Sequence, residues 1–490
     1  MGVICFFSLV SEYQTMMNRV LLLSPFYSSV YGSFKPAFKA GFLNPPLGLC
    51  YIASSLQKKG YEAFIIDAES GDESLEEVVR NGLSLKPDVI GITATSPVFT
   101  SALEMSRAIK KLSSVPIVLG GPHVTIMKNQ VLEEYPEFDF GVIGEGEETL
   151  PELFEAITGK HDFFNIQGLI YRDGGNRVIV TQERPVLKDI DNLPFPDRTL
   201  IHNERYTRSV PGKGIVKAAA VMSSRGCPFQ CIYCAIKKIP GGNHVRMRSA
   251  KNVVDEIEYI VKKLGIRHIS FNDDDLTMSR NRTIQMCEEI LKRKIEITWE
   301  GLTRATLVDR ELFQIMKEAG FVRVSFGIES GNPEILKGLN RNVTLEDVEK
   351  AIEMAKAAGL ITRGSIMIGL PNDTRKTVKE TLDYVCRLKF LDQVIINITT
   401  PYPGTVLEEM AKRGEGGMRL LSEDLSELRR FGNAVIEVND LKKQDLIKFQ
   451  KAGLLKFYLS SPKRAFRNLT EAGFKSAMVN SYAFIRSILK

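Results

Sequence analysis

Residues 225–234 read Arg225-Gly226-Cys227-Pro228-Phe229-Gln230-Cys231-Ile232-Tyr233-Cys234. The three cysteines have Cys-x3-Cys-x2-Cys spacing and directly follow an apolar stretch, residues 218–222, that predicts a β-strand. Cysteine thiolates hold iron–sulfur clusters, and a cluster of four irons takes four ligands. A tight loop that offers three leaves one iron open to a ligand from outside the protein. The spacing therefore predicts an iron–sulfur site with Cys227, Cys231 and Cys234 as its ligands.

A structural zinc site and three chance core cysteines are the alternatives for this loop. Structural zinc sites are usually closed by a fourth Cys or His. The nearby candidate, His244, follows Cys234 by ten residues and lies past a Gly-Gly turn. The iron–sulfur interpretation is therefore preferred. Cys287 and Cys386 fall on helix patterns and are expected to be core residues.

With an aromatic residue, Tyr233, before the last cysteine, the loop resembles the signature of the radical S-adenosylmethionine (SAM) superfamily. In that family the open iron is chelated by the amino and carboxylate groups of SAM. One electron then cleaves SAM to methionine and a 5′-deoxyadenosyl radical, which abstracts a hydrogen atom from the substrate. The resemblance implies a [4Fe-4S] cluster, SAM and an electron donor such as flavodoxin or ferredoxin.

Residues 215–400 alternate strand patterns with helix patterns. Six strand–helix repeats predict a partial TIM-type (β/α)6 barrel, in which chemistry is expected at the C-terminal ends of the strands. The cysteine loop follows the first strand, as that rule requires. The expected strands are 218–223, 268–272, 297–301, 322–327, 363–369 and 394–399.

The resemblance extends to the turns after these strands. Asp273 and Asp274 stand where the family contacts the SAM amino group, although its usual sequence there is Gly-Gly-Glu; a solvated acidic turn is the alternative. Arg304 is expected to pair with the SAM carboxylate, because a guanidinium fork matches a carboxylate. A structural salt bridge is the alternative for Arg304. Glu329 resembles the ribose or methionine contact, with a surface carboxylate as the alternative. The remaining implied SAM contacts are Tyr233, Ser330 and Gly369.

Residues 18–160 also alternate strand and helix patterns, which predicts a parallel, doubly wound (Rossmann-like) sheet. Ligands on such sheets bind beyond the carboxyl ends of the strands, and the loops there are rich in Gly and polar residues. The expected strands are 20–24, 63–67, 89–93, 117–120 and 141–143.

This N-terminal region, including the Asn-Pro-Pro-Leu-Gly-Leu run at 44–49, resembles the cobalamin-binding domain of cobalamin-dependent radical SAM enzymes. The resemblance then covers most of residues 18–400 and implies cobalamin as a further cofactor. The Asp-x-His-x-x-Gly loop that supplies a cobalt ligand in other cobalamin proteins is absent, and His123 is the only histidine in 18–160. A domain used only for packing or dimerisation is the alternative. The implied cobalamin contacts are Thr95, Ser96, Gly120, Gly121, His123, Gly144 and Glu145.

Three further segments complete the expected organisation. Residues 161–214 are expected to form a hairpin and linker, and 401–490 a helical C-terminal region whose basic helices cap the barrel, with membrane contact as the alternative. Residues 1–17 are expected to be an extension before a native start at Met16 or Met17.

Composition narrows the class of protein. An apolar content of 44% and a charged content of 25% are typical of a soluble globular protein. A net charge of +6 over 490 residues gives no argument for nucleic acid, and seven cysteines do not indicate a disulfide scaffold. No apolar run is long enough for a spanning helix. An oxygen-sensitive cluster needs a reducing compartment, so the cytoplasm is expected.

The resemblance implies a small-molecule substrate, with a hydrophobic molecule as one option. It also implies one of two reactions. One is methylation of an unactivated carbon, in which one SAM supplies a methyl group through cobalamin and a second supplies the radical. The other is a radical cyclisation or rearrangement, as in the resembling anaerobic magnesium-protoporphyrin ester cyclase. A tRNA methylthiotransferase would add a second three-cysteine cluster, for which Cys5 and Cys50 are too few. A non-enzymatic cofactor carrier is the remaining alternative.

Overall fold

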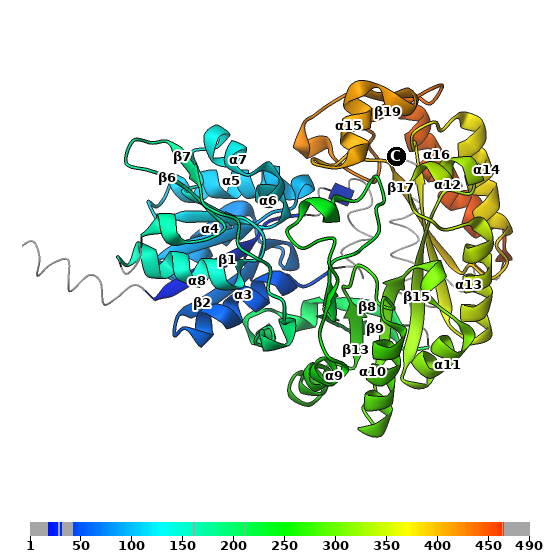
Figure 1. Ribbon diagram of the computed structural model, residues 1–490, viewed down its shortest axis with the longest axis horizontal. Helices are drawn as coiled ribbons and strands as arrows, with labels where there is room; N and C mark the ends of the chain where they lie inside the picture. Colours follow the sequence, from blue (N-terminus) through cyan, green and yellow to red (C-terminus); the bar gives the residue numbers. More distant parts are fainter. Residues whose placement is uncertain are drawn as a thin grey trace, which may run out of the picture.

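The computed structural model describes residues 18–27, 30–31, 43–159, 162–210, 212–462 and 464, which form two lobes (Figure 1). The N-terminal lobe carries one open sheet, and the second lobe carries a curved sheet surrounded by helices. The expected extension 1–17 lies outside the described residues, as do the last residues of the expected C-terminal region.

The N-terminal sheet has seven strands in the order β2-β1-β3-β4-β5-β6-β7. The first five in this order are parallel, as predicted, and the predicted hairpin adds two antiparallel strands at the β5 edge. The order 2-1-3-4-5 reverses between β1 and β3, which makes that point a switch point where ligands bind. The strands are β1 (Arg19–Ser24), β2 (Glu62–Asp67), β3 (Val89–Thr93), β4 (Ile117–Gly120), β5 (Phe140–Val142), β6 (Leu169–Arg172) and β7 (Val178–Val180).

Helices cover both faces of this sheet because successive strand residues point to opposite sides. Val20 and Leu22 pack with α3 (Leu47–Lys58) and α8 (Gly146–Ile157). Leu21 and Leu23 pack in the other core, against α4 and α5. Two short helices follow β4. The elements on this side are α4 (Leu75–Ser84), α5 (Phe99–Lys110), α6 (Pro122–Met127) and α7 (Asn129–Glu134).

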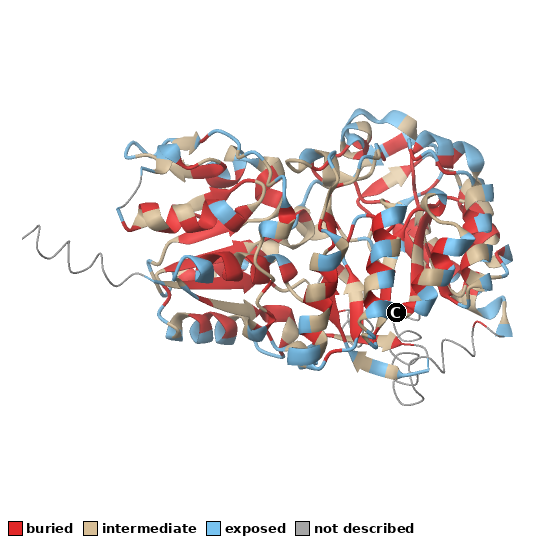
Figure 2. Ribbon diagram, turned by 60° about the horizontal axis from the view of Figure 1, so that its bottom comes forward, coloured by how far each residue is buried: buried red, intermediate tan, exposed pale blue. Residues whose placement is uncertain are grey.

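The second lobe contains six parallel strands in the order β10-β13-β14-β15-β16-β17, which confirms the predicted partial barrel. Figure 2 shows these strands as buried under an outer layer of half-exposed helices. The strands are β10 (Ala219–Val221), β13 (His268–Phe271), β14 (Thr298–Thr303), β15 (Phe321–Glu329), β16 (Ile361–Ile368) and β17 (Gln393–Ile398). The helices are α9 (Ala250–Tyr259), α10 (Arg280–Lys292), α11 (Arg310–Glu318), α12 (Pro333–Gly338), α13 (Leu345–Ala357) and α14 (Arg375–Arg387).

Buried ion pairs fill the barrel near the N-terminal ends of its strands. Glu300 accepts from Arg323 at 2.7 Å and lies 3.5 Å from Arg208, which belongs to the hairpin β8 (Thr207–Val210) and β9 (Gly214–Lys217). Burial opposes ionisation of Glu300, but these arginines outweigh it and hold its pKa at about 2. This end of the barrel is therefore closed, and the open end is the one that carries the cysteine loop.

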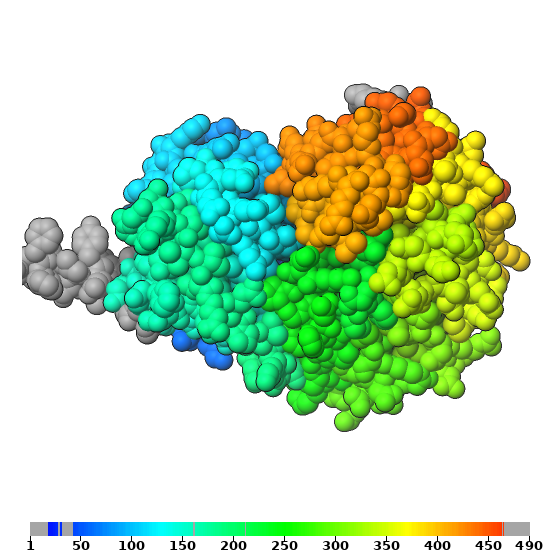
Figure 3. All heavy atoms as spheres, turned by 45° about the horizontal axis from the view of Figure 1, so that its top comes forward, coloured from blue at the N-terminus to red at the C-terminus, as the bar shows by residue number. Residues whose placement is uncertain are grey.

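The C-terminal region combines helices with a small hairpin: α15 (Val406–Arg413), β18 (Met418–Leu420), β19 (Ile436–Val438) and α16 (Lys443–Leu459). Leu446, Leu454 and Phe457 of α16 are buried in the barrel's core cluster, so this helix covers its own domain. Figure 3 shows residues of this region lying against the N-terminal lobe. None of the described helices has the length and apolarity that crossing a membrane requires.

A buried carboxylate anchors the linker to the barrel. Glu256 of α9 is fully buried and pairs with Arg198 of the linker and with Arg248. Arg198 also donates to the carbonyl of Ala220 in the first barrel strand, at 2.6 Å. Arg248 donates to the carbonyl of Met222, in the turn after that strand, at 2.9 Å. Among the described residues, Glu256 is therefore the carboxylate that forms an ion pair with each of the two guanidinium groups.

Glu256→Gln is expected to lower the free energy of unfolding by about 3 kcal/mol, because it leaves two buried guanidinium groups without a counter-charge. The measurement is the shift of the urea midpoint. The exposed Glu288→Gln on α10 is the control and is expected to shift it little. Equal midpoints for the two variants would contradict this account.

Candidate active site

The cysteine loop leaves the barrel after β10 and is closed at its base by a two-stranded ribbon, β11 (Ser224–Arg225) and β12 (Arg246–Met247). Glycines let the loop fold on itself. A Cβ at Gly226, which has a φ of +96°, would lie 2.4 Å from the carbonyl oxygen of His244, and one at Gly242 would lie 1.8 Å from that of Ile236. The backbone N–H of Cys227 donates to Gly242 at 2.8 Å. The loop is thus a compact, preformed turn.

Cys227, Cys231 and Cys234 are free thiols. The neighbouring thiols of Cys231 and Cys227 raise the pKa of the Cys234 thiol. Burial is the largest cause and brings that pKa to about 11, so metal binding must displace the proton. In the described part of the chain no three Cys, His, Asp or Glu side chains converge on one metal ion. Three thiols in one loop are the donor set that fits an iron–sulfur cluster.

Arg304 lies beside the cysteine loop, directly after β14. Its guanidinium carbon is 3.6 Å from the ring centroid of Phe229, which stands between the first two cysteines. The side chain is buried, and its Nε and Nη2 have no hydrogen-bond partner among the described residues. Buried donors are normally paired. An unpaired, buried guanidinium fork at this place is a site for an anion such as a carboxylate.

The acidic turn after β13 divides into two structural carboxylates and one that faces the cavity. Asp273 is buried and accepts from the backbone N–H and hydroxyl of Ser223 and from Ser224. Asp275 is buried and accepts from the backbone N–H of Arg304 at 3.1 Å. Asp274 is exposed and accepts only from Gly226, at 3.2 Å, among the described residues. Asp274 is therefore the carboxylate available to a ligand.

Glu329 ends β15 with a φ of +65°, a conformation that costs energy for a residue other than glycine. Tyr233 of the cysteine loop donates to Glu329 at 3.2 Å. Arg341 donates to Glu329 at 3.1 Å and to the Tyr233 hydroxyl at 2.6 Å. Burial raises the pKa of Glu329, and Arg341 acts in the opposite direction. This strained carboxylate is thereby fixed to the loop that carries the cysteines.

The two other predicted SAM contacts have partners in the protein. The hydroxyl of Ser330 is buried and lies 3.1 Å from that of Thr381 on α14. Gly369 has a φ of +82°, and its backbone N–H donates to Asp373 at 3.0 Å. Both residues hold the turns at the ends of β15 and β16.

An ion-pair group joins the base of the cysteine loop to the N-terminal lobe. Arg225 pairs with Glu145 at 2.6 Å and with Glu147 at 2.5 Å, and Arg246 pairs with Glu145 at 2.8 Å. Burial acts to raise the pKa of Glu145, but the two arginines outweigh it and hold its pKa below the ordinary value. The Arg225 guanidinium also lies 5.6 Å from the ring centroid of Tyr51 on α3. We call Arg225, Arg246, Glu145 and Glu147 the clasp.

A cavity of about 430 Å³, the inter-lobe cavity, lies between the clasp and the carboxyl edge of the N-terminal sheet. Its inner part is an apolar slot between the sheet and helices α3 and α8, lined by Leu22, Ile52, Val118, Val142 and Leu150. Its outer part is lined by the second lobe, namely Met222, Ser224, Arg225, Gly226, Ile236, Ile239, Pro240, Gly242, Arg246, Asn272 and Asp274. Both lobes are therefore needed to form it.

The predicted cobalamin contacts separate into three groups. Gly120, Gly121, Gly144 and Glu145 line the inter-lobe cavity. Thr95 lines a neighbouring pocket instead. Ser96 and His123 are buried, with the Ser96 hydroxyl 3.1 Å from Nδ1 of His123. Burial lowers the pKa of His123 to about 4, and its ring packs 4.1 Å from that of Phe99, so His123 is a neutral core residue.

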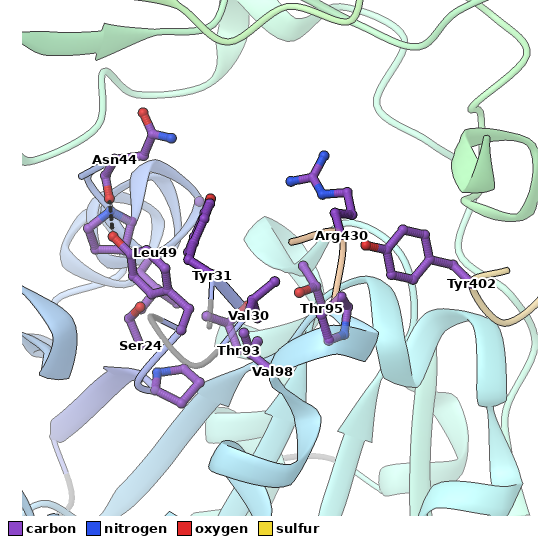
Figure 4. A pocket seen from close by; sticks show the side chains of 15 residues that line it. Ser24, Val30, Tyr31, Asn44, Leu49, Thr93, Thr95, Val98, Tyr402 and Arg430 are labelled. Atoms are coloured by element: carbon purple, nitrogen blue, oxygen red, sulfur yellow. Dashed lines mark hydrogen bonds between the residues drawn. The ribbon is translucent and has the colours of Figure 1, made fainter. Parts of the chain in front are cut away.

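The neighbouring pocket, with a volume of about 380 Å³, lies at the β1–β3 switch point (Figure 4). We call it the tyrosine pocket. It shares Gly48, Leu49 and Thr93 with the inter-lobe cavity. The C-terminal region supplies its far side through Tyr402 and Arg430.

Comparison with known proteins agrees with this geometry. Residues 221–385 match the family model of the radical SAM superfamily, and residues 37–154 match that of the B12 binding domain. An uncharacterized methyltransferase of Pyrococcus horikoshii is 32% identical over 81% of this chain and 83% of its own length. The chain belongs to the radical SAM superfamily, in the group that carries a B12-binding domain. The resemblance predicted from the sequence is thus confirmed.

Other relatives differ in the reaction that they perform. The anaerobic magnesium-protoporphyrin IX monomethyl ester cyclase of Rubrivivax gelatinosus is 33% identical over 74% of this radical SAM chain and 64% of its own length. Among solved structures, the fold is similar to that of the methyltransferase TsrM from Kitasatospora setae, solved with cobalamin and a [4Fe-4S] cluster bound. The TM-score is 0.71 at 16% identity, over 96% of this chain and 99% of that one.

Sequence reasoning did not single out several residues of this radical SAM site. The clasp arginines flank the cysteine loop, and their charge is opposite to that of the Gly-Glu-Gly-Glu run at 144–147. This opposite charge is the sequence signal that could have indicated the ion pairs. Met222 and Asn272 stand at barrel-strand ends, where the fold places functional residues. Arg430 and the pocket tyrosines have no local sequence signature.

Arg225→Gln is expected to loosen the cysteine loop, because it breaks two partly buried ion pairs at the loop's base. Amide hydrogen exchange across residues 226–245 should accelerate about tenfold. Arg177→Gln, which breaks an exposed pair with Asp173, is the matched control and should leave this segment unchanged. Identical exchange in the two variants would show that the clasp does not hold the loop.

Proposed function

We propose that this protein is a cobalamin-dependent radical SAM enzyme that methylates an unactivated carbon of a small molecule. The observation that supports this most is the inter-lobe cavity, in which the B12-binding domain and the cysteine loop face one another. A cofactor held on the sheet edge would lie next to the cysteine loop. We also place the protein in a reducing compartment, the cytoplasm, with flavodoxin or ferredoxin as electron donor.

The cluster and SAM would be bound by different residues. Cys227, Cys231 and Cys234 would hold the cluster. Arg304, whose Nε and Nη2 have no partner in the described part of the chain, would bind the SAM carboxylate. Asp274 would receive the SAM amino group, because an exposed carboxylate is the natural partner of an ammonium.

The remaining predicted contacts act at the margins of the SAM site. Glu329, fixed by Tyr233 and Arg341, would accept from a ribose hydroxyl or the methionine part. The Gly369 turn would border SAM through its backbone. Asp273 and Ser330 would support these residues from behind, since their oxygens have partners within the protein.

The N-terminal lobe would hold cobalamin through the glycine-lined part of the cavity. Gly120, Gly121 and Gly144 permit close approach of a ligand to the backbone. The apolar slot between α3, α8 and the sheet would take an apolar part of the cofactor. His123 is paired with Ser96 and buried, so we assign no cobalt ligand to it.

When bound, the cluster and SAM supply a 5′-deoxyadenosyl radical, and cobalamin supplies a methyl carrier. The protein's own contribution is positional. Arg304 and Asp274 would orient SAM against the loop, and the clasp fixes the loop against the sheet edge.

Radical cyclisation is the second candidate, favoured by the 33% identity to the magnesium-protoporphyrin ester cyclase. The two reactions consume SAM differently. Methylation yields S-adenosylhomocysteine from one SAM and 5′-deoxyadenosine from the other. Anaerobic turnover with dithionite and hydroxocobalamin should therefore produce both. Formation of 5′-deoxyadenosine alone would favour cyclisation, and formation of neither would favour a non-enzymatic carrier.

Arg304→Gln is expected to weaken SAM binding by about tenfold or more, because it removes a charge-assisted partner of the carboxylate. Equilibrium dialysis with the reconstituted protein measures the dissociation constant. Arg310→Gln, an exposed arginine on α11, is the control and should bind SAM as the unmodified protein does. Unchanged affinity in Arg304→Gln would remove Arg304 from the SAM site.

Cys231→Ala is expected to abolish cluster assembly, since a loop with two thiolates leaves two irons without protein ligands. Cys287→Ala removes a buried thiol on α10 and should retain the cluster. Iron content and the visible absorbance of the anaerobically reconstituted variants report the result. Loss of iron in Cys287→Ala would contradict the assignment.

A further inference from the structure

We propose that the tyrosine pocket is the substrate site and that the substrate is a flat, mainly apolar molecule with one carboxylate, which pairs with Arg430. The inference rests on the proposed function, because the pocket's place beside the cofactor cavity is what makes it a substrate site. It adds the chemical class of the substrate and the residue that recognises its charge.

The position of the pocket suits a substrate. Gly48, Leu49 and Thr93 form a common wall with the inter-lobe cavity, so a molecule in the pocket would lie next to a cofactor on the sheet edge. Its volume of about 380 Å³ falls within the range of small-molecule sites. Both lobes contribute, since the turn Ser96–Val98 after β3 contacts the C-terminal turn Leu425–Glu427.

The walls of the pocket suit a flat apolar body. Tyr27, Tyr31 and Tyr402 line it, and tyrosine presents an apolar ring face together with a polar tip. The ring of Tyr31 stacks on Phe431 with centroids 5.7 Å apart, which fixes its orientation. Tyrosine hydroxyls are neutral near pH 7. Burial raises the pKa of Tyr31 and of Tyr402 further, while the neighbouring Arg430 acts in the opposite direction. The apolar lining residues are Pro25, Val30, Pro46, Leu49, Pro97 and Val98.

Arg430 gives the pocket its charge. It is the only charged residue among the 15 described residues that line the pocket, and Figure 4 shows it beside Tyr402, across from Tyr31. Its side chain is exposed, and no carboxylate of the described chain lies within ion-pair distance. The other described residues that line the pocket carry no charge, and a guanidinium among them matches a single carboxylate in shape and charge.

Among the residues that the structure describes, the inter-lobe cavity offers no comparable place for an anion. Its arginines, Arg225 and Arg246, are paired with Glu145 and Glu147. Asp274 in the same wall would repel a carboxylate. Apart from Arg304, which we assign to the SAM carboxylate, the described residues leave the tyrosine pocket as the place for a monoanionic ligand.

The test uses two flat probes that differ in charge, 1-pyrenebutyrate and 1-pyrenebutanol. Equilibrium dialysis against the anaerobically purified full chain, with and without hydroxocobalamin, gives their dissociation constants. Arg430→Gln should weaken 1-pyrenebutyrate about tenfold and change 1-pyrenebutanol less than about twofold, because only the anion loses a charged partner. Arg429→Gln is the matched control, since the neighbouring Arg429 donates to Ser426 at 3.0 Å and does not line the pocket. It should leave both probes unchanged.

Three results would overturn the inference: equal affinity of 1-pyrenebutyrate for Arg430→Gln and the unmodified chain, equal weakening of both probes, or displacement of 1-pyrenebutyrate by hydroxocobalamin. The last would assign the pocket to the cofactor. Failure of the proposed function is read separately, from the products of SAM turnover. A chain that makes neither adenosyl product but still binds 1-pyrenebutyrate through Arg430 would retain the anion site without the radical chemistry.

Discussion

The ion pairs of Arg225 with Glu145 and Glu147 fix the cysteine loop against the N-terminal lobe, and the geometry of the site depends on them. Arg225 directly precedes the Gly226-Cys227 turn, so a shift of this side chain would move the first thiol. Partly buried pairs of this kind add specificity of position more than stability, because desolvation offsets much of their attraction. The clasp is therefore best understood as a spacer between two binding surfaces.

Once the loop is fixed, the other features of the site follow from the two sheets. The N-terminal sheet presents its glycine-rich carboxyl edge, and the barrel presents the turns after its own parallel strands. The barrel's other end is closed by Glu300, Arg323 and the hairpin residue Arg208. Ligands bound at the two sheets would consequently meet in the space between the lobes. The C-terminal region completes the tyrosine pocket at the margin of that space.

The fold was largely predictable because strand–helix alternation and the cysteine spacing are local signals. Individual contacts were not, because they depend on side-chain direction and on partners far away in the sequence. Asp273 and Asp274 are neighbours of identical chemistry, yet the backbone turns one toward Ser223 and leaves the other facing the cavity. Arg430 reaches a pocket built mainly by residues 24–98, a pairing that no periodicity predicts. The burial of His123 beside Phe99 is a further contact that depends on packing and that its sequence motif does not predict.

The central claim is that one chain holds an iron–sulfur cluster and cobalamin on facing surfaces. The most direct measurement is the metal content of the full chain, purified without oxygen and supplied with iron, sulfide and hydroxocobalamin. The account predicts about four irons, as one [4Fe-4S] cluster requires, and about one cobalt per chain. Four irons without cobalt would contradict the role given to the N-terminal lobe, and the absence of iron would contradict the role given to the cysteine loop.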